Sequence, residues 1–181
     1  MRILLTGIDG YLGALMGPHL VARGHEVIGL DAGYYRDGLL YEPSGDRIPT
    51  ITRDIRQITA ADLRGFDAVV HLAELSNDPI GQNRPAVTYA INGEGSANLA
   101  RHAKEAGVRR FLYSSSCSVY GAGGADWKTE ESPTDPLTAN AECKLRTEAV
   151  LAALADDTFS PTCMRNATAY GASPRMRFDI V

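Results

Sequence analysis

Residues 6–13 read Thr6-Gly7-Ile8-Asp9-Gly10-Tyr11-Leu12-Gly13. An apolar run over residues 2–6 precedes this stretch, and apolar residues at helical spacing follow it over residues 11–23. Glycines between a strand and a helix permit a tight turn and let backbone N–H groups approach a phosphate, to which the helix N-terminus adds its partial positive charge. The stretch therefore predicts a strand–turn–helix unit that cradles a pyrophosphate, with contacts from Gly7, Asp9, Gly10, Tyr11, Leu12 and Gly13.

The rest of the chain alternates short apolar runs with longer helical patterns, which is typical of repeated βαβ units. We therefore expect an α/β fold, a Rossmann-like doubly wound parallel sheet with helices on both faces, in one domain that spans residues 1–181. Pro18 lies inside the first helical pattern and predicts a kink or a tight local accommodation. The expected strands are residues 2–6, 26–30, 49–52, 68–72, 110–113 and 162–165, and the expected helices are residues 11–23, 84–106 and 137–155.

The composition is that of an ordinary globular domain, with 44% hydrophobic and 22% charged residues and a net charge of −4. The negative charge argues against a nucleic-acid surface, and no apolar run approaches the roughly 20 residues of a membrane-spanning helix. Cys117, Cys143 and Cys163 are odd in number and lack metal-binding spacing. We therefore expect a cytoplasmic protein with no metal site and with neither nucleic acid nor membrane as a partner.

An acidic residue, Asp31, ends the second expected strand about 20 residues after the glycine turn. At that place a carboxylate accepts hydrogen bonds from the adenosine ribose and repels a 2′-phosphate, which predicts NAD as the cofactor, although Arg36 keeps NADP open. Asp54 closes the third strand, where it would either face an adenine amino group or cap a turn. His71 lies in an apolar strand and is predicted to be a hydrogen-bonded core residue rather than a catalyst.

Taken together, the motifs resemble those of the extended short-chain dehydrogenase/reductase family, of the NAD-dependent nucleotide-sugar epimerase/dehydratase type. The resemblance covers nearly the whole chain, from Gly7 to Gly171. It implies NAD contacts from Asp54, Ile55, Leu72, Ala73, Asn92, Ser114 and Lys144 in addition to the glycine turn and Asp31. The matching motifs are Thr6–Gly13, Asp31, Asp54-Ile55, His71-Leu72-Ala73, the Asn-x-x-Gly-x-x-Asn-Leu pattern at Asn92–Leu99, Ser114–Gly121 and Arg165…Tyr170-Gly171.

The resemblance also implies a catalytic Tyr-x-x-x-Lys pair on a helix, assisted by a serine. Ser116 resembles the assisting serine, and Lys144 resembles the lysine, which also binds the nicotinamide ribose. A free tyrosine has a pKa of about 10, and the nearby lysine favours the phenolate that takes a proton from a sugar hydroxyl. The position four residues before Lys144 is occupied by Asn140, which cannot ionise.

Asn140 therefore predicts that catalysis by this chain is impaired or absent, because loss of a positioned acid–base group costs about 10²–10⁴-fold in rate. Three explanations are open: an engineered or incidental Tyr-to-Asn change, a naturally inactive relative, or an enzyme that recruits another base. The first is favoured because the surrounding motifs are kept. Tyr113 and Tyr120 are possible substitutes, but packing explains a tyrosine at those places more simply.

The residues after Ser116 narrow the reaction. Dehydratases of the family typically carry Asp-Glu where this chain has Cys117-Ser118, so the resemblance favours a 4-epimerase-like reaction, with transient oxidation to a keto sugar and re-reduction. A nucleotide-sugar keto-reductase or dehydrogenase and a non-catalytic NAD-binding sensor or scaffold are the alternatives. The expected contacts to the nucleotide-sugar substrate are Ser76, Asn77, Ser116, Cys117, Ser118 and Asn166.

Two expectations about the assembly follow from the same resemblance. The chain would be the N-terminal part of a longer epimerase-type protein, with the C-terminal substrate domain largely missing. A homodimer would form by packing the helices over residues 84–106 and 137–155 into a four-helix bundle. The alanines that would permit this close approach, although alanines also pack inside a monomer, are Ala97, Ala100, Ala103, Ala141, Ala149 and Ala152.

Overall fold

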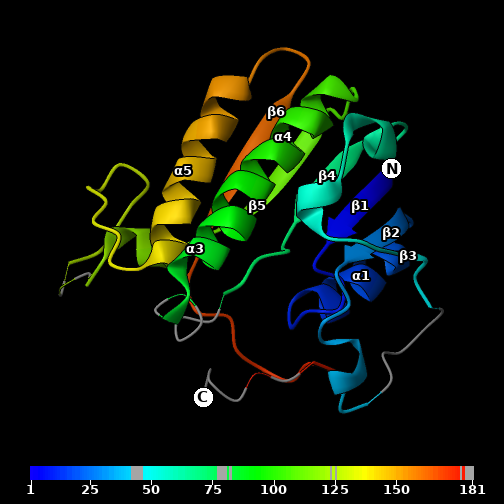
Figure 1. The fold of residues 1–181 in the computed structure, drawn as a ribbon, viewed down its shortest axis with the longest axis horizontal. Helices are drawn as coiled ribbons and strands as arrows, with labels where there is room; N and C mark the ends of the chain where they lie inside the picture. The colour runs from blue at the N-terminus through cyan, green and yellow to red at the C-terminus, as the bar shows by residue number, and fades with distance from the viewer. Residues whose placement is uncertain are drawn as a thin grey trace.

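The protein folds around one parallel sheet with the strand order β3-β2-β1-β4-β5-β6 (Figure 1). This description rests on a computed structural model, which describes residues 1–41, 47–76, 81, 83–122, 124, 126–175 and 177. The strand order reverses between β1 and β4, and the carboxyl ends of the strands at such a switch point are where ligands bind in open α/β sheets. The strands are β1 (Arg2–Thr6), β2 (Glu26–Asp31), β3 (Thr50–Thr52), β4 (Ala68–His71), β5 (Arg110–Ser116) and β6 (Ser160–Asn166).

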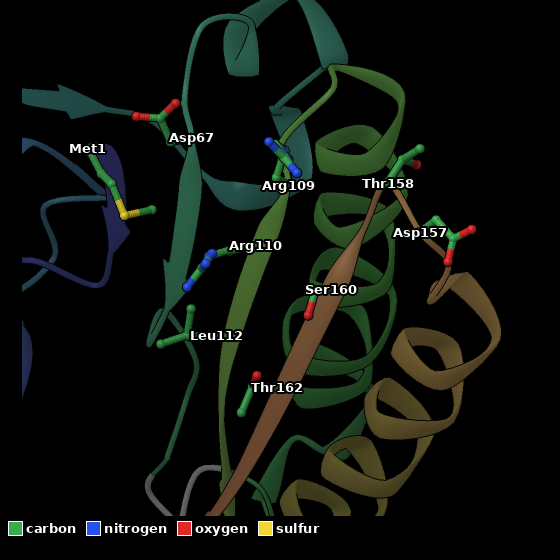
Figure 2. Close-up of a pocket in the computed structure, with 9 residues that line it drawn as sticks. All are labelled: Met1, Asp67, Arg109, Arg110, Leu112, Asp157, Thr158, Ser160 and Thr162. Carbon is green, nitrogen blue, oxygen red and sulfur yellow. The ribbon is translucent and has the colours of Figure 1, made fainter.

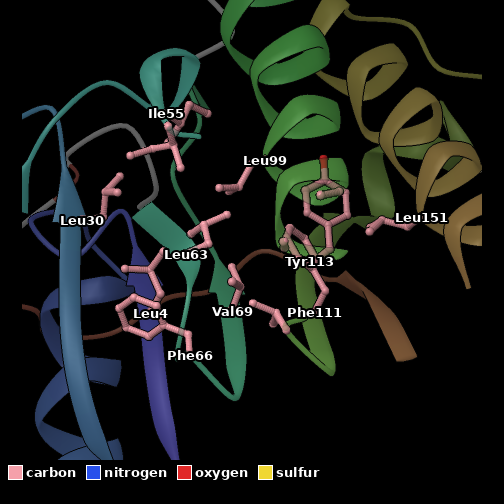
Figure 3. Close-up of a cluster of buried hydrophobic side chains, with 14 of the residues drawn as sticks. Leu4, Leu30, Ile55, Leu63, Phe66, Val69, Leu99, Phe111, Tyr113 and Leu151 are labelled. Atoms are coloured by element: carbon pink, nitrogen blue, oxygen red, sulfur yellow. The ribbon is translucent and has the colours of Figure 1, made fainter. Parts of the chain in front are cut away.

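Helices cover both faces of the sheet, as expected for a doubly wound fold. Side chains alternate along β1, so that Leu4 packs into one apolar cluster while Ile3 and Leu5 pack into the other. The helix α1 (Gly13–Ala22) packs with Ile3 and Leu5, whereas α4 (Ser96–Glu105) and α5 (Ala139–Leu154) cover the cluster on the opposite face. Figure 3 shows the cluster beneath α4 and α5, whose labelled members include Leu4, Val69, Leu99, Phe111, Tyr113 and Leu151.

The expected helix over residues 84–106 is divided into three parts. A short helix α3 (Pro85–Thr88) runs into a π-helical turn at Tyr89–Gly95, and α4 follows directly.

The first helix, α1, begins at Gly13 rather than at residue 11, because the glycine turn extends to Leu12. It continues through Pro18 without a break. Within the described ranges, no helix is both long and apolar enough to cross a membrane.

Most of the alanines that were expected to line a dimer interface are buried within this chain. Ala97, Ala100, Ala103 and Ala141 are at most 8% exposed and pack inside the fold. These four residues therefore cannot form the close contact between two copies, and the expectation that they do is wrong. Ala149 and Ala152 are exposed on α5, and the homodimer itself stays a prediction.

The buried face of α5 provides a test of the core. Leu151 on α5 is fully buried, whereas Leu15 on α1 is 45% exposed. Leu151→Ala should lower the free energy of unfolding by about 2–5 kcal/mol, because it removes a core side chain and leaves a cavity. Leu15→Ala, the matched control, should cost less than about 1 kcal/mol. Urea denaturation of both variants measures the difference, and equal losses would contradict this assignment of the core.

Candidate active site at the carboxyl edge of the sheet

The glycine turn brings β1 against the end of β4. Gly7 has a φ of 76°, and a Cβ at this position would lie 2.9 Å from the backbone nitrogen of Ala73. A Cβ at Gly13 would lie 2.0 Å from the carbonyl oxygen of Gly7, so only glycine allows the helix to start this close to the turn. The predicted strand–turn–helix unit is therefore present, and both glycines are required by close approach.

The start of α1 is suited to an anion. Among the residues that the structure describes, no side chain caps the first turn of this helix, and no acidic residue lies within that turn. The backbone N–H groups at a helix N-terminus carry partial positive charge and bind phosphate readily. A pyrophosphate over the glycine turn would receive these donors without competition from a capping side chain.

Asp31 lies beside the same turn. Its carboxylate accepts hydrogen bonds from the backbone N–H groups of Asp9 (3.2 Å) and Gly33 (2.9 Å). Partial burial, together with the nearby Asp9 carboxylate, raises the pKa of Asp31 above its ordinary value. The side chain is thereby fixed at the carboxyl end of β2, where a ribose hydroxyl can donate to it.

Two other charged residues near this edge, Arg36 and Asp54, already have partners within the protein. The Arg36 guanidinium donates to the Asp9 carboxylate (3.1 Å) and to Thr52 Oγ1 (3.0 Å). The Asp54 carboxylate caps the 3₁₀ turn that follows it and pairs with Arg56, which lowers the pKa of Asp54. Of the two interpretations of Asp54, the structure therefore shows the turn cap, and contact with an adenine stays a prediction.

His71 is a buried core residue, as expected. Its Nδ1 lies 2.7 Å from Thr6 Oγ1 and its Nε2 lies 2.8 Å from Ser96 Oγ. The ring stacks on Tyr113 with 5.6 Å between the ring centres. Burial, with a smaller contribution from the Lys144 charge, lowers the pKa of His71 to about 3. The imidazole is neutral at ordinary pH and serves as a hydrogen-bonded part of the sheet edge.

Lys144 is buried rather than solvated, and it forms an ion pair with Glu74. The Glu74 side chain is 3% exposed and the Lys144 side chain is 8% exposed. Glu74 also accepts a hydrogen bond from the Tyr113 hydroxyl (2.6 Å), and burial together with the Glu74 charge raises the pKa of Tyr113 far above its ordinary range. Glu74 was not predicted as a site residue, although an acid directly after the His71-Leu72-Ala73 motif is a signal that could identify it.

Asn140 lies next to Asn92. The Asn92 amide donates to Asn140 Oδ1 (2.9 Å) and also bonds the backbone oxygen and nitrogen of Leu75 (2.9 Å each). Asn92 is fully buried in the π-helical turn. It therefore connects the segment after β4 to α5, and a direct contact between Asn92 and a cofactor stays a prediction.

The serine-rich end of β5 meets the end of β6. Ser116 Oγ accepts hydrogen bonds from the backbone N–H of Ser118 (3.1 Å) and from Ser118 Oγ (2.9 Å). The Asn166 amide donates to Ser114 Oγ (3.1 Å), and Cys117 is exposed beside them. The structure thus gathers most of the expected sugar-binding residues at one edge, whereas Asn77 lies outside the described residues.

Both tyrosines that were considered as substitute bases are already engaged. Tyr113 is completely buried against Glu74, as described above. The Tyr120 hydroxyl donates to the carbonyl oxygen of Thr129 (2.8 Å) and accepts a hydrogen bond from Arg165 (2.9 Å). These contacts support the interpretation of both residues as structural.

Comparison with known proteins agrees with this geometry. The family model described as NAD dependent epimerase/dehydratase family matches residues 3–179. The chain belongs to this family. A UDP-glucose 4-epimerase from Mycolicibacterium smegmatis is 31% identical over 160 residues, which are 83% of this chain and 50% of that protein.

Two solved structures show the same fold. The structure of a UDP-glucose-4-epimerase from Stenotrophomonas maltophila, with bound NAD and formylated UDP-arabinopyranose, matches with a TM-score of 0.81 and 28% identity over 91% of this chain and 52% of that one. The NAD-dependent NDP-hexosamine 5,6-dehydratase TunA matches with a TM-score of 0.80 and 27% identity, over 91% of this chain and 54% of that one. The chain therefore spans about half the length of the epimerases and dehydratases it resembles.

The residues at the switch point fit the NAD on which this epimerase/dehydratase family depends. Gly7 and Gly13 leave no room for side chains between the turn, the helix and β4. In the described part of the chain the N-terminus of α1 has no side-chain cap, and Asp31 is fixed beside the turn.

A separate open hollow of about 770 Å³ lies at the opposite edge of the sheet, at the amino ends of β4, β5 and β6 (Figure 2). Its lining carries charges of both signs (Asp67, Arg109, Arg110 and Asp157) and no glycine turn, so it does not suit a pyrophosphate.

The buried His71 predicts a specific response to acid. Because its folded-state pKa of about 3 lies below the ordinary value of 6.5, the unfolded chain takes up the proton first as the pH falls. This residue should therefore remove about 1.4 kcal/mol of stability per pH unit below 6.5, or about 2 kcal/mol at pH 5. Urea denaturation between pH 7.5 and 5 should show a shallower pH dependence for His71→Gln than for the unaltered protein.

His102→Gln is the control for this experiment, because His102 lies on the surface of α4 and is only partly buried. That variant should keep the pH dependence of the unaltered protein. An identical slope in His71→Gln and in the unaltered protein would show that His71 is not the acid-sensitive group.

Proposed function

We propose that this chain is the NAD-binding domain of a nucleotide-sugar 4-epimerase type protein in which the acid–base step is impaired. The observation that carries the proposal is the meeting of the glycine turn, the uncapped start of α1 and the Asp31 carboxylate at the switch point of the sheet. Membership of the NAD-dependent epimerase/dehydratase family supports the same assignment.

Each part of this edge has a role toward the cofactor. The backbone N–H groups of the turn and of the first turn of α1 would bind the pyrophosphate, and Asp31 would accept from the adenosine ribose. Bound NAD would take a hydride from a sugar carbon and return it. Arg36 is held by Asp9 and Thr52, and Asp31 would repel a 2′-phosphate, which supports NAD rather than NADP.

Ser116 would hold the reacting sugar oxygen. A serine hydroxyl has two lone pairs and one hydrogen, and Ser118 donates to Ser116 Oγ through both its backbone and its side chain. The Ser116 hydrogen is therefore directed outward as a donor to a substrate oxygen. Ser76, Cys117 and Asn166 lie at the same edge and would line the sugar site. The UDP-glucose and the formylated UDP-arabinopyranose of two relatives favour a UDP-sugar as the substrate.

Asn140 stands where the proton acceptor is required. Its amide cannot ionise at ordinary pH, and its oxygen already accepts a hydrogen bond from Asn92. Removal of a sugar hydroxyl proton would therefore lack a positioned base, and the rate would fall by about 10²–10⁴-fold. A keto-reductase or dehydrogenase would need the same base, so Asn140 impairs either reaction.

A non-catalytic NAD-binding sensor is the second candidate function. It is favoured by Asn140 together with the ion pair that Lys144 forms with Glu74. Conversion of a UDP-sugar to its 4-epimer in the presence of NAD, even at a rate lowered by about 10²–10⁴-fold, would favour the impaired epimerase. Binding of NAD with no conversion above the uncatalysed rate would favour the sensor.

Titration of NAD into the protein by calorimetry tests the cofactor assignment. Asp31→Ala should weaken NAD binding by about 10- to 100-fold, because hydrogen bonds to a charged group are lost. Asp37→Ala removes an exposed acid from the following loop and should change the affinity less than about twofold. Equal effects of the two substitutions, or no binding of millimolar NAD by the unaltered protein, would overturn the proposed function.

A further inference from the structure

The buried ion pair between Glu74 and Lys144 joins the end of β4 to α5. Glu74 Oε1 accepts from the Tyr113 hydroxyl (2.6 Å) and from Ser96 Oγ (3.4 Å), while Oε2 faces the Lys144 ammonium. Ser96 in turn bonds His71. Glu74 is thus held by β5 and α4 as well as by Lys144, and its position is fixed from several sides.

Two acceptors inside the protein hold the Lys144 ammonium. A lysine has three N–H donors. One faces the Glu74 carboxylate and one bonds the backbone oxygen of Ser114, while the ammonium also lies 4.9 Å from the centre of the Tyr113 ring, a cation–π contact that uses no N–H donor. Because the Lys144 side chain is 8% exposed and two of its three donors are engaged, a ribose could take a hydrogen bond only from the third donor unless one of these contacts broke.

Breaking the contact with Glu74 is unfavourable. Both side chains are buried, at 3% and 8% exposure, so separation would leave a carboxylate in low-dielectric surroundings without its counter-charge. Removing one partner of a buried pair is strongly destabilising for this reason. The same burial leaves Glu74 no open path to a sugar hydroxyl, which argues against Glu74 as a replacement base.

We propose that Glu74 is a positioning residue that locks Lys144 away from the cofactor, so that this site departs from a catalytic one at two positions, 74 and 140. The proposal rests on the proposed NAD binding. It implies that the chain holds NAD through the glycine turn and Asp31, with no contribution from Lys144, and that tyrosine at position 140 alone would not restore a working base. Lys144 then has a structural use, as the counter-charge of Glu74.

Calorimetric titration of NAD into three forms of the full chain tests the lock. Glu74→Gln keeps the size of the side chain and its contact with Tyr113 but removes the charge, and it should tighten NAD binding by about 10-fold, because a charge-assisted hydrogen bond from Lys144 becomes available. The double variant Glu74→Gln with Lys144→Gln leaves no unpaired charge. It should bind NAD within about twofold of the unaltered protein, because Lys144 contributes nothing there.

Glu148→Gln is the matched control. Glu148 lies on α5, as Lys144 does, and is largely buried in an ion pair with Arg165, so loss of this ion pair should lower the melting temperature without tightening NAD binding. If Glu74→Gln does not fold, Glu74→Asp withdraws the carboxylate by one methylene and should give a smaller gain in affinity. If Glu74 had a purely structural role, its substitutions would change the melting temperature and leave the affinity for NAD unchanged.

The outcomes separate the lock from the proposed function. Unchanged or weaker NAD binding by Glu74→Gln, or binding by the double variant more than about fivefold weaker than that of the unaltered protein, would overturn the lock while NAD binding stands. Absence of NAD binding by all forms would overturn the proposed function itself, and the lock with it.

Discussion

Gly7 directly follows β1, and its backbone adopts the left-handed conformation that favours glycine. The end of β4 passes so close to it that a Cβ at this position would lie 2.9 Å from the Ala73 nitrogen. This close approach determines where the other parts of the site lie. It sets the start of α1 at Gly13 and keeps Thr6 and His71 in register on neighbouring strands. The arrangement of residues at the carboxyl edge is therefore a consequence of how tightly two strands and one helix pack.

From this point, a line of polar side chains crosses the sheet inside the protein. Thr6 bonds His71, His71 bonds Ser96, and Ser96 bonds Glu74, which pairs with Lys144. Buried polar groups stabilise a fold only when each has its partner, and a partly satisfied network is unfavourable. The network thus connects the glycine turn to α5, the helix that carries Lys144.

The sequence predicts local features well and long-range contacts poorly. The glycine turn, Asp31 and the apolar strands are recognisable because each depends on neighbouring residues, and the buried, neutral state of His71 follows from its apolar strand. The π-helical turn at Tyr89–Gly95 was not predicted, because it lies inside residues 84–106, which were interpreted as one continuous helix. Glu74 was missed because its partner lies on α5, far away along the chain, and the Ala97–Ala103 face was misassigned because small residues suit an internal interface as well as an external one.

The ion pair at the end of β4 also bears on how incomplete catalytic motifs are interpreted in other sequences. A lysine that occurs without the tyrosine expected beside it invites interpretation as a trace of activity. In this chain Lys144 also has a structural role, since its loss would leave the buried Glu74 carboxylate without a counter-charge. A retained lysine therefore indicates activity only when the residue that directly follows the His-Leu-Ala motif, here Glu74, is considered with it.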